Sequence, residues 1–339
     1  METGRSVNGS SYFSKKTVFL MSTVFAINFL SLVYQIIWTR KIMVIFGTTA
    51  LSISTILTVF LAGIALGGYL GGGWIKKAGN KYRFLGLLLV ALGLYCLLAT
   101  FLLGFVREPF MYLTGMADAP LASNLIKLFL SFIILIVPTT IIGATFPIIT
   151  YLYSVDFKDF GRDVALIYFL DTLGAAAGAI VCGFFLVPRI GLRESSSIGA
   201  VIYMALGLLI ILSRKGAAIQ AQAQAAPEEG PRPRLDSTRA FVLAALFFSG
   251  FAALVLEVTW SRFFHLLFGT SIYAFSLVLA AFLLGLSVGS AVIKRYLDRF
   301  KNPILVFAYI EMLIAVFALL TIHTNGWIEN VYFKYFYEM

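Results

Sequence analysis

Charged residues are scarce in this chain. They make up 12% of its 339 residues, whereas an ordinary soluble domain carries about 25%. Cysteine is almost absent as well, since Cys96 and Cys182 are the only two and each lies inside an apolar run. Two cysteines and two histidines provide neither a disulfide framework nor the usual ligand set of a metal site. We therefore expect no metal and no cofactor, and we expect both cysteines to serve packing.

Apolar residues make up 60% of the chain and come in blocks of about 20, the length that crosses the hydrocarbon core of a bilayer. This pattern predicts an all-α polytopic membrane protein with about nine transmembrane helices. A catalytic domain is not expected, because no strand–glycine turn–helix unit, P-loop or Ser-His-Asp arrangement is found. The nine predicted helices are 17–39, 49–75, 83–106, 123–153, 163–188, 195–213, 240–262, 271–293 and 303–323.

Basic residues predict the topology. The net charge is +10, but the basic residues lie in short clusters between apolar blocks, which argues against nucleic acid as a partner and for the positive-inside rule. Segments on the N-terminal side of the membrane hold 18 of the 26 lysines and arginines. We therefore expect a multi-pass protein of the bacterial inner membrane with a cytoplasmic N-terminus and a retained first helix. The predicted segments are a cytoplasmic tail (1–16), a first six-helix repeat (17–213), a cytoplasmic linker (214–239), a partial second repeat of three helices (240–323) and an outer aromatic tail (324–339).

The chain contains an internal duplication. Phe25–Gly72 recurs 222 residues later as Phe247–Lys294, and 15 of the first 43 aligned positions are identical. The first helices of the two copies are six spans apart, so both cross the membrane in the same direction. The repeat is therefore parallel, as are the two halves of a major facilitator transporter. The expected architecture is a truncated bundle of that type, with six helices followed by three.

Three carboxylates fall inside predicted membrane helices, where ionisable groups are costly and suggest function. They are Glu257, Asp171 and Glu311. The duplication pairs Glu257 with Gln35, so the two copies differ at their most charged position, and Trp260 shares a helix face with Glu257. We predict that these five residues form a substrate site for a small cation. The alternatives are a hydrogen-bonded structural aspartate and simple sequence drift at position 257.

Small residues at four-residue spacing predict close helix packing, and prolines inside a helix predict a kink, which is either a hinge beside a cavity or a passive bend. The packing glycines are Gly63, Gly67, Gly71, Gly174, Gly178, Gly285 and Gly289. The kink prolines are Pro138 and Pro147.

Several motifs together resemble a known family. They are EVTWSR, FGTSIYAFS and AAFLLGLSVGS in the second copy, GATFP at 143–147, and DTLGAAAG followed by GFFLVPRIGL at 171–192. They resemble the membrane portion of the bacterial fused transporter-like/spermidine synthase proteins over roughly residues 20–320. This resemblance implies a transporter-like bundle and polyamine as the cation, but the aminopropyltransferase domain of the family does not follow in this chain. Asp171 stands where asparagine is expected in that family.

Three functions are compatible with the sequence. The first is a transporter-like or channelling domain for a small cation such as a polyamine. The second is a non-catalytic assembly subunit of a larger membrane complex, such as a respiratory one, in which a partner membrane chain or a second copy completes the shorter half. The third is a membrane enzyme that lacks its catalytic domain and works with a separate synthase domain. The lipid bilayer is a partner in each case.

Overall fold

The computed structural model describes residues 7–47, 50–115, 120–153, 160–213, 236–268, 272–296, 299 and 301–336. The long elements in these ranges are all helical, and nine long helices match the nine apolar blocks. The all-α polytopic fold is confirmed. The elements are α1 (Val7–Phe46), α2 (Ala50–Lys77), α3 (Lys81–Phe105), α4 (Arg107–Gly115), α5 (Pro120–Tyr153), α6 (Phe160–Val181), the π-helix η1 (Cys182–Leu186), α7 (Val187–Leu212), α9 (Ser237–Phe268), α10 (Ile272–Tyr296) and α11 (Pro303–Phe336).

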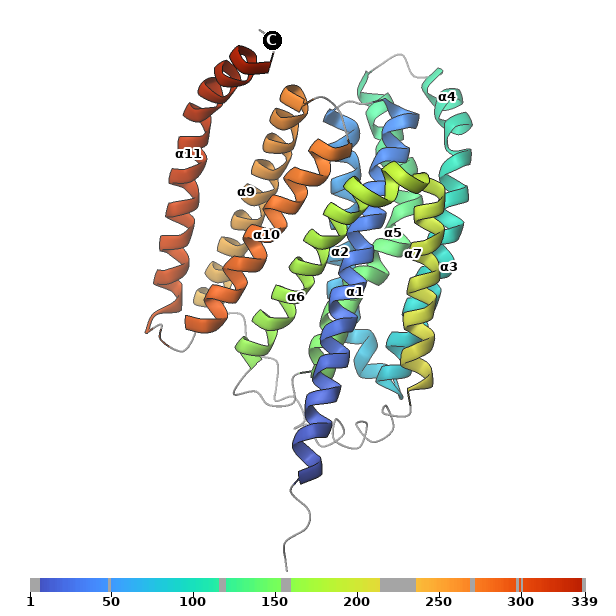
Figure 1. Cartoon of the computed structure of the whole chain (residues 1–339), viewed down its shortest axis with the longest axis vertical. Helices are drawn as coiled ribbons and strands as arrows, with labels where there is room; N and C mark the ends of the chain where they lie inside the picture. Colours follow the sequence, from blue (N-terminus) through green and yellow to red (C-terminus); the bar gives the residue numbers. More distant parts are fainter. Residues whose placement is uncertain are drawn as a thin grey trace, which may run out of the picture.

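Eight helical stretches among the described residues are long and apolar enough to cross a membrane. One of them, Gly161–Leu212, has 52 residues and would measure about 78 Å at 1.5 Å per residue, against a hydrocarbon core of about 30 Å. It contains both α6 and α7, which run in opposite directions (Figure 1). The chain turns at Gly191, whose φ of 85° lies in the left-handed region that favours glycine.

The helices differ from their predicted bounds at three places. α1 begins at Val7, ten residues before the predicted start, so most of the predicted polar tail is helical. α11 continues to Phe336 through most of the predicted aromatic tail. The short helix α4 lies in a segment predicted as a loop, because its nine residues are too few to form an apolar block. Residues 214–235 of the predicted linker lie outside the described residues.

The first six long helices form three closely packed pairs: α2 with α5, α3 with α7 and α1 with α6. Glycines make the close approach possible. A Cβ added to Gly71 would lie 2.8 Å from the carbonyl oxygen of Ala144, one added to Gly178 would lie 3.0 Å from the Cα of Phe29, and one added to Gly86 would lie 2.7 Å from the carbonyl oxygen of Gly207. The predicted packing glycines Gly63, Gly67, Gly71, Gly174 and Gly178 all lie at such contacts.

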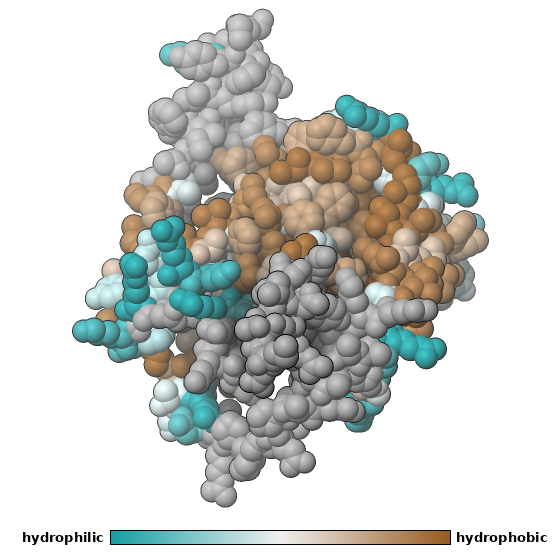
Figure 2. Space-filling view, turned by 60° about the horizontal axis from the view of Figure 1, so that its bottom comes forward, coloured by the Kyte–Doolittle hydropathy of each residue, from teal (hydrophilic) through white to brown (hydrophobic). Residues whose placement is uncertain are grey.

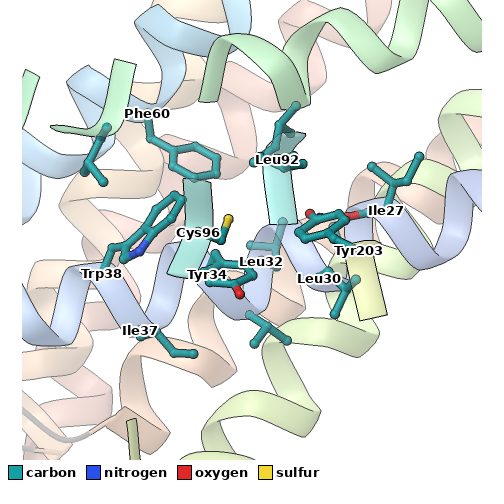
Figure 3. Packing of buried hydrophobic residues seen from close by; sticks show 14 of the residues in the cluster. Ile27, Leu30, Leu32, Tyr34, Ile37, Trp38, Phe60, Leu92, Cys96 and Tyr203 are labelled. Atoms are coloured by element: carbon teal, nitrogen blue, oxygen red, sulfur yellow. Dashed lines mark hydrogen bonds between the residues drawn. The ribbon is translucent and has the colours of Figure 1, made fainter. Parts of the chain in front are cut away.

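Aromatic residues fill the centre of this six-helix body (Figure 3). The ring of Tyr34 lies 5.1 Å from that of Trp38 and 5.9 Å from that of Tyr203. The hydroxyl of Tyr203 donates to the carbonyl oxygen of Ile27 at 2.9 Å, and that of Tyr34 donates to the carbonyl oxygen of Ser196. Burial of the rings is therefore accompanied by hydrogen bonds that tie α1 to α7.

Both predicted kink prolines lie inside α5, which continues through them as one helix. Proline lacks an N–H, so Pro138 leaves the carbonyl of Ile134, four residues earlier, without its usual helical donor. The hydroxyl of Tyr95 in α3 donates to that oxygen at 3.1 Å. The freed backbone group is thus satisfied by a neighbouring helix, which a membrane interior requires.

The last three long helices lie along one side of the six-helix body (Figure 1). α10 packs against α6, α9 packs against α10, and α11 packs against α9. The hydroxyls of Ser287 and Ser290 in α10 donate to the carbonyl oxygens of Phe169 (3.2 Å) and Ala165 (2.7 Å) in α6. No described side chain of α11 is buried, so this helix presents apolar surface on nearly all sides.

Exposed basic residues gather at one end of the bundle, which we call the basic end. α2 and α10 end there, and α3 and α11 begin there (Figure 1). Figure 2 looks toward this end and shows hydrophilic residues around it and a hydrophobic wall behind. The positive-inside rule predicts that this end is cytoplasmic, and a cytoplasmic N-terminus stays a prediction. The exposed basic residues at this end, among those described, are Lys76, Lys77, Arg83, Arg162, Arg239, Arg295, Arg299 and Lys301.

Candidate functional site

Helix α9 buries polar side chains and exposes apolar ones. Among its described side chains just two are buried: Glu257, at 8% exposure, and Ser261, at 4%. They are four residues apart and therefore lie on one helix face. Phe247 and Phe251, on the same helix, are 69% and 61% exposed. Apolar side chains that face lipid are ordinary for a membrane helix, so the distinguishing feature of α9 is that its inward face carries polar groups.

The repeat partner of Glu257 lies in the first copy in an equally enclosed place. Gln35, in α1, is 6% exposed. The two tryptophans differ: Trp38 is fully buried beside Phe60, whereas its counterpart Trp260 is half-buried. The indole N–H of Trp38 has no hydrogen-bond partner among the described residues. The first copy is thus the more tightly packed of the two.

Asp171 lies on α6 where that helix crosses α1. The side chain of Asn28 in α1 is within hydrogen-bonding reach of its carboxyl group. One and two turns further along α6, Gly174 and Gly178 sit against the backbone of Phe25 and Phe29. The carboxyl is therefore enclosed by a close helix pair and partnered by an amide, which fits the structural alternative as well as a ligand site.

Glu311 has a partner on a neighbouring helix. The hydroxyl of Ser249 in α9 donates to Oε1 of Glu311 in α11 at 2.6 Å. Ser249 precedes Glu257 by eight residues, which corresponds to about 12 Å along the helix axis. Glu311 thus ties α11 to α9 and is placed away from the Glu257–Ser261 face.

The five predicted site residues are spread over four helices. Glu257 and Trp260 belong to α9, Gln35 to α1, Asp171 to α6 and Glu311 to α11. In the part of the chain that the structure describes, no hydrogen bond or electrostatic contact links the three carboxylates. No group of three or more His, Cys, Asp or Glu side chains gathers within the described ranges.

The predicted glycine contacts divide between the two copies. Gly63 and Gly67 in α2 lie against α5, but Gly285 and Gly289 in α10 have no other helix within 4 Å of a built Cβ among the described residues. α10 uses its serines, not these glycines, against α6. The described helices do not pack on Gly285 and Gly289, so close helix packing at these two glycines stays a prediction.

Three further features escape sequence reasoning. Asn28 gives no signal, because one amide among apolar residues is uninformative until Asp171 is placed beside it. Lys41 is half-buried, and its Nζ donates to the carbonyl oxygen of Thr100 at 3.2 Å. The π-helix η1 precedes Pro188, and π-helical turns often mark functional sites. The reversal between α6 and α7 at Gly191 falls in the break that the sequence predicts between residues 188 and 195.

The described geometry is that of a helical membrane bundle with a duplicated plan and polar groups turned inward. The model of the Major Facilitator Superfamily matches residues 18–333. This chain belongs to the Major Facilitator Superfamily. The match spans both copies of the repeat and all nine long helices. No curated protein and no solved structure matches the chain.

Membership in this superfamily makes the chain a transporter-like, multi-pass membrane protein. Superfamily proteins are built from two halves of six helices, related by an axis along the membrane normal. The duplication between α1–α2 and α9–α10 follows that relation. Substrate sites in such transporters lie near the middle of the bilayer, between the halves. Inward polar side chains such as Gln35 in α1 and Glu257 in α9 are therefore candidates for a substrate site.

Proposed function

We propose that this protein transports a small organic cation and that Glu257 is the anionic group that attracts it. The observation that supports the proposal is the inward face of α9, which encloses Glu257 and Ser261 and leaves the apolar residues of the helix outside. Enclosed carboxylates in a membrane interior are costly to keep and are usually retained for function. A polyamine is the cation that the family resemblance favours.

The electrostatics favour a cation over an anion or a neutral solute. A carboxylate and an ammonium group 4 Å apart attract by about 4 kcal/mol at an effective dielectric constant of 20, against about 1 kcal/mol in water. Ser261, one turn from Glu257, can accept a hydrogen bond from the same ammonium group. Asp171, held by Asn28, would provide a second anionic group for a solute with a second amine.

The test is uptake of radiolabelled spermidine and putrescine into proteoliposomes that contain the full chain. We expect Glu257→Gln to reduce uptake at least tenfold, because the amide keeps the shape and removes the charge. Glu108→Gln is the matched control, since Glu108 is an exposed residue of α4, and it should leave uptake unchanged. Uptake by Glu257→Gln at the wild-type rate would refute the role of Glu257 in attracting the cation.

Assembly is the competing outcome. If the wild-type chain moves no cation, and a second membrane polypeptide copurifies with it at a fixed ratio in mild detergent, the chain acts as a subunit that needs a partner. The exposed sides of α11 make that result physically reasonable, since no described side chain of α11 is buried.

A further inference from the structure

Two positive charges meet at the end of the bundle opposite the basic end. Lys41 lies near the end of α1 and Arg193 lies near the start of α7, and both helices reach that end of the bundle beside α3 (Figure 1). Lys41 is half-buried, whereas Arg193 is exposed. The two side chains are close enough for their charges to repel each other. We call Lys41 and Arg193 the cation pair.

Helix α3 brings the cation pair together. The Nζ of Lys41 donates to the carbonyl oxygen of Thr100 at 3.2 Å, and the guanidinium of Arg193 lies over the ring of Phe101, 5.9 Å from its centroid. The hydroxyls of Thr100 and Ser196 share a hydrogen bond that ties α3 to α7 at the same level. Two adjacent residues of one helix thus hold the two cations, and the contact between the helices limits how far they can move apart.

No carboxylate in the described part of the chain neutralises the cation pair. Among the described residues, Arg193 is the charged group that acts on Lys41, and neither cation forms an ion pair there. Glu194 follows Arg193 in the sequence, but its carboxyl group lies against Gly191, 3.2 Å from a Cβ built on that residue. Like charges repel more strongly in a partly buried place than in water, so the pair is a favourable place for an anion.

The cation pair also keeps hydrogen-bond donors for such an anion. An ammonium group has three N–H donors, and the bond to Thr100 leaves two of those of Lys41. A guanidinium has five donors in a planar fork that matches two oxygens of one phosphate group. The guanidinium of Arg193 donates to no other described residue. A phosphate group is therefore the anion whose oxygens suit the pair.

The surface next to the cation pair, toward the middle of the bundle, is apolar and exposed. α3 and α7 touch there, since a Cβ built on Gly93 would lie 2.7 Å from the carbonyl oxygen of Ala200. An apolar surface beside two cations at the end of a membrane bundle suits a ligand that carries acyl chains on its phosphate. The exposed apolar side chains of this surface are Leu94, Leu98 and Phe101 in α3 and Ile198 and Val201 in α7.

We propose that the cation pair binds the phosphate of an anionic phospholipid whose acyl chains lie along the exposed apolar residues of α3 and α7. The lipid belongs to the leaflet opposite the basic end. A zwitterionic lipid is disfavoured, because its ammonium group would bring a third positive charge to the pair. Free inorganic phosphate lacks the apolar contacts and should bind far more weakly. The inference concerns the lipid surface and holds whichever solute the protein moves.

The experiment detects lipid at this surface through a tryptophan introduced by Val201→Trp, about 12 Å along α7 from Arg193. The full chain is reconstituted in bilayers of phosphatidylglycerol and phosphatidylcholine, and one of the two lipids carries brominated acyl chains, which quench a tryptophan that they contact. Quenching with either lipid brominated gives their relative affinity at the site. The same titration without Val201→Trp corrects for the four natural tryptophans.

We expect the anionic lipid to be preferred by roughly 25-fold, because each cation beside an anionic headgroup contributes about fivefold. Arg193→Gln and Lys41→Gln should each lower this preference about fivefold. Arg193 is exposed, so its variant should keep the fold even if Lys41→Gln does not. The matched control is Arg189→Gln, since Arg189 is an exposed arginine of α7 whose guanidinium lies 5.2 Å from the ring centroid of Phe185. It lies outside the cation pair and should leave the preference unchanged.

Three results would overturn the proposal. An equal preference with and without Arg193→Gln would mean that the cation pair does not select the lipid. An equal loss in Arg189→Gln would mean that any basic residue at this end attracts anionic lipid without a defined site. Relief of the quenching by inorganic phosphate at millimolar concentration would make free phosphate the ligand. None of these results bears on uptake by Glu257→Gln, so the lipid site and the proposed transport are tested separately.

Discussion

The clearest prediction compares one substitution at two equivalent positions, Gly67→Ala in α2 and Gly289→Ala in α10. The two residues share a sequence motif and a place in the repeat, but differ in what surrounds them. A Cβ on Gly67 would lie 2.7 Å from the backbone nitrogen of Ala144, and a Cβ on Gly289 would meet nothing within 4 Å. The same methyl group should therefore destabilise the protein at Gly67 and leave it as stable, or slightly more stable, at Gly289.

The magnitude follows from the shortfall in distance. Carbon and nitrogen atoms in contact are about 3.5 Å apart, so α2 and α5 must separate locally by at least roughly 0.8 Å to admit the methyl group at Gly67, since the carbonyl oxygen of Thr140 lies closer to it still. The neighbour is backbone and cannot swing aside, and overpacking of this kind costs roughly 1–3 kcal/mol. At Gly289 no such cost arises. Alanine there should be neutral or should stabilise the helix by up to about 1 kcal/mol, the difference in helix propensity between the two residues.

The assay is reversible unfolding in mixed micelles of mild detergent and dodecyl sulfate, followed by circular dichroism, with the free energy of unfolding compared among variants. Gly68→Ala is the matched control, because it lies next to Gly67 on the same helix and has no neighbour within 4 Å. Its stability should resemble that of Gly289→Ala. If Gly67→Ala is as stable as Gly68→Ala, the close packing of α2 on α5 is wrong.

Two further substitutions test hydrogen bonds between helices. Tyr95→Phe removes the hydroxyl that donates to the carbonyl oxygen of Ile134. It should lower the free energy of unfolding by about 0.5–1.5 kcal/mol, and a value near zero in the same assay would mean that water or another group satisfies that oxygen. Ser249→Ala removes the hydrogen bond to Glu311 and should cost about 0.6 kcal/mol, the mean for such bonds in a membrane bundle. Protease accessibility of α11 should rise with it, and unchanged accessibility would contradict a tie between α9 and α11.

The sequence predicts the number and position of the long helices well, because each must present about 20 apolar residues to the bilayer. It misses α4, whose nine residues make no apolar block. It also cannot separate Glu311 from Glu257, since both read as single carboxylates in apolar helices. The difference lies in tertiary structure, which gives Glu311 the hydroxyl of Ser249 and encloses Glu257 on the inward face of α9.

Helix packing at glycines is a second feature that the sequence alone does not predict. Gly67 and Gly289 stand in matching motifs, and spacing alone predicts close packing for both. Whether a glycine is packed depends on the helix opposite it, and that helix belongs to another part of the sequence or to another molecule. The duplication supplies the missing information only after the structure shows that α5 covers the glycines of α2.

The role proposed for Glu257 is to attract a small organic cation during transport. The most direct measurement is initial uptake of labelled spermidine by proteoliposomes containing wild type, Glu257→Gln or the control Glu108→Gln at equal protein content. We expect uptake by wild type and Glu108→Gln and at least a tenfold loss in Glu257→Gln. Equal uptake by all three, or none by wild type, would contradict it.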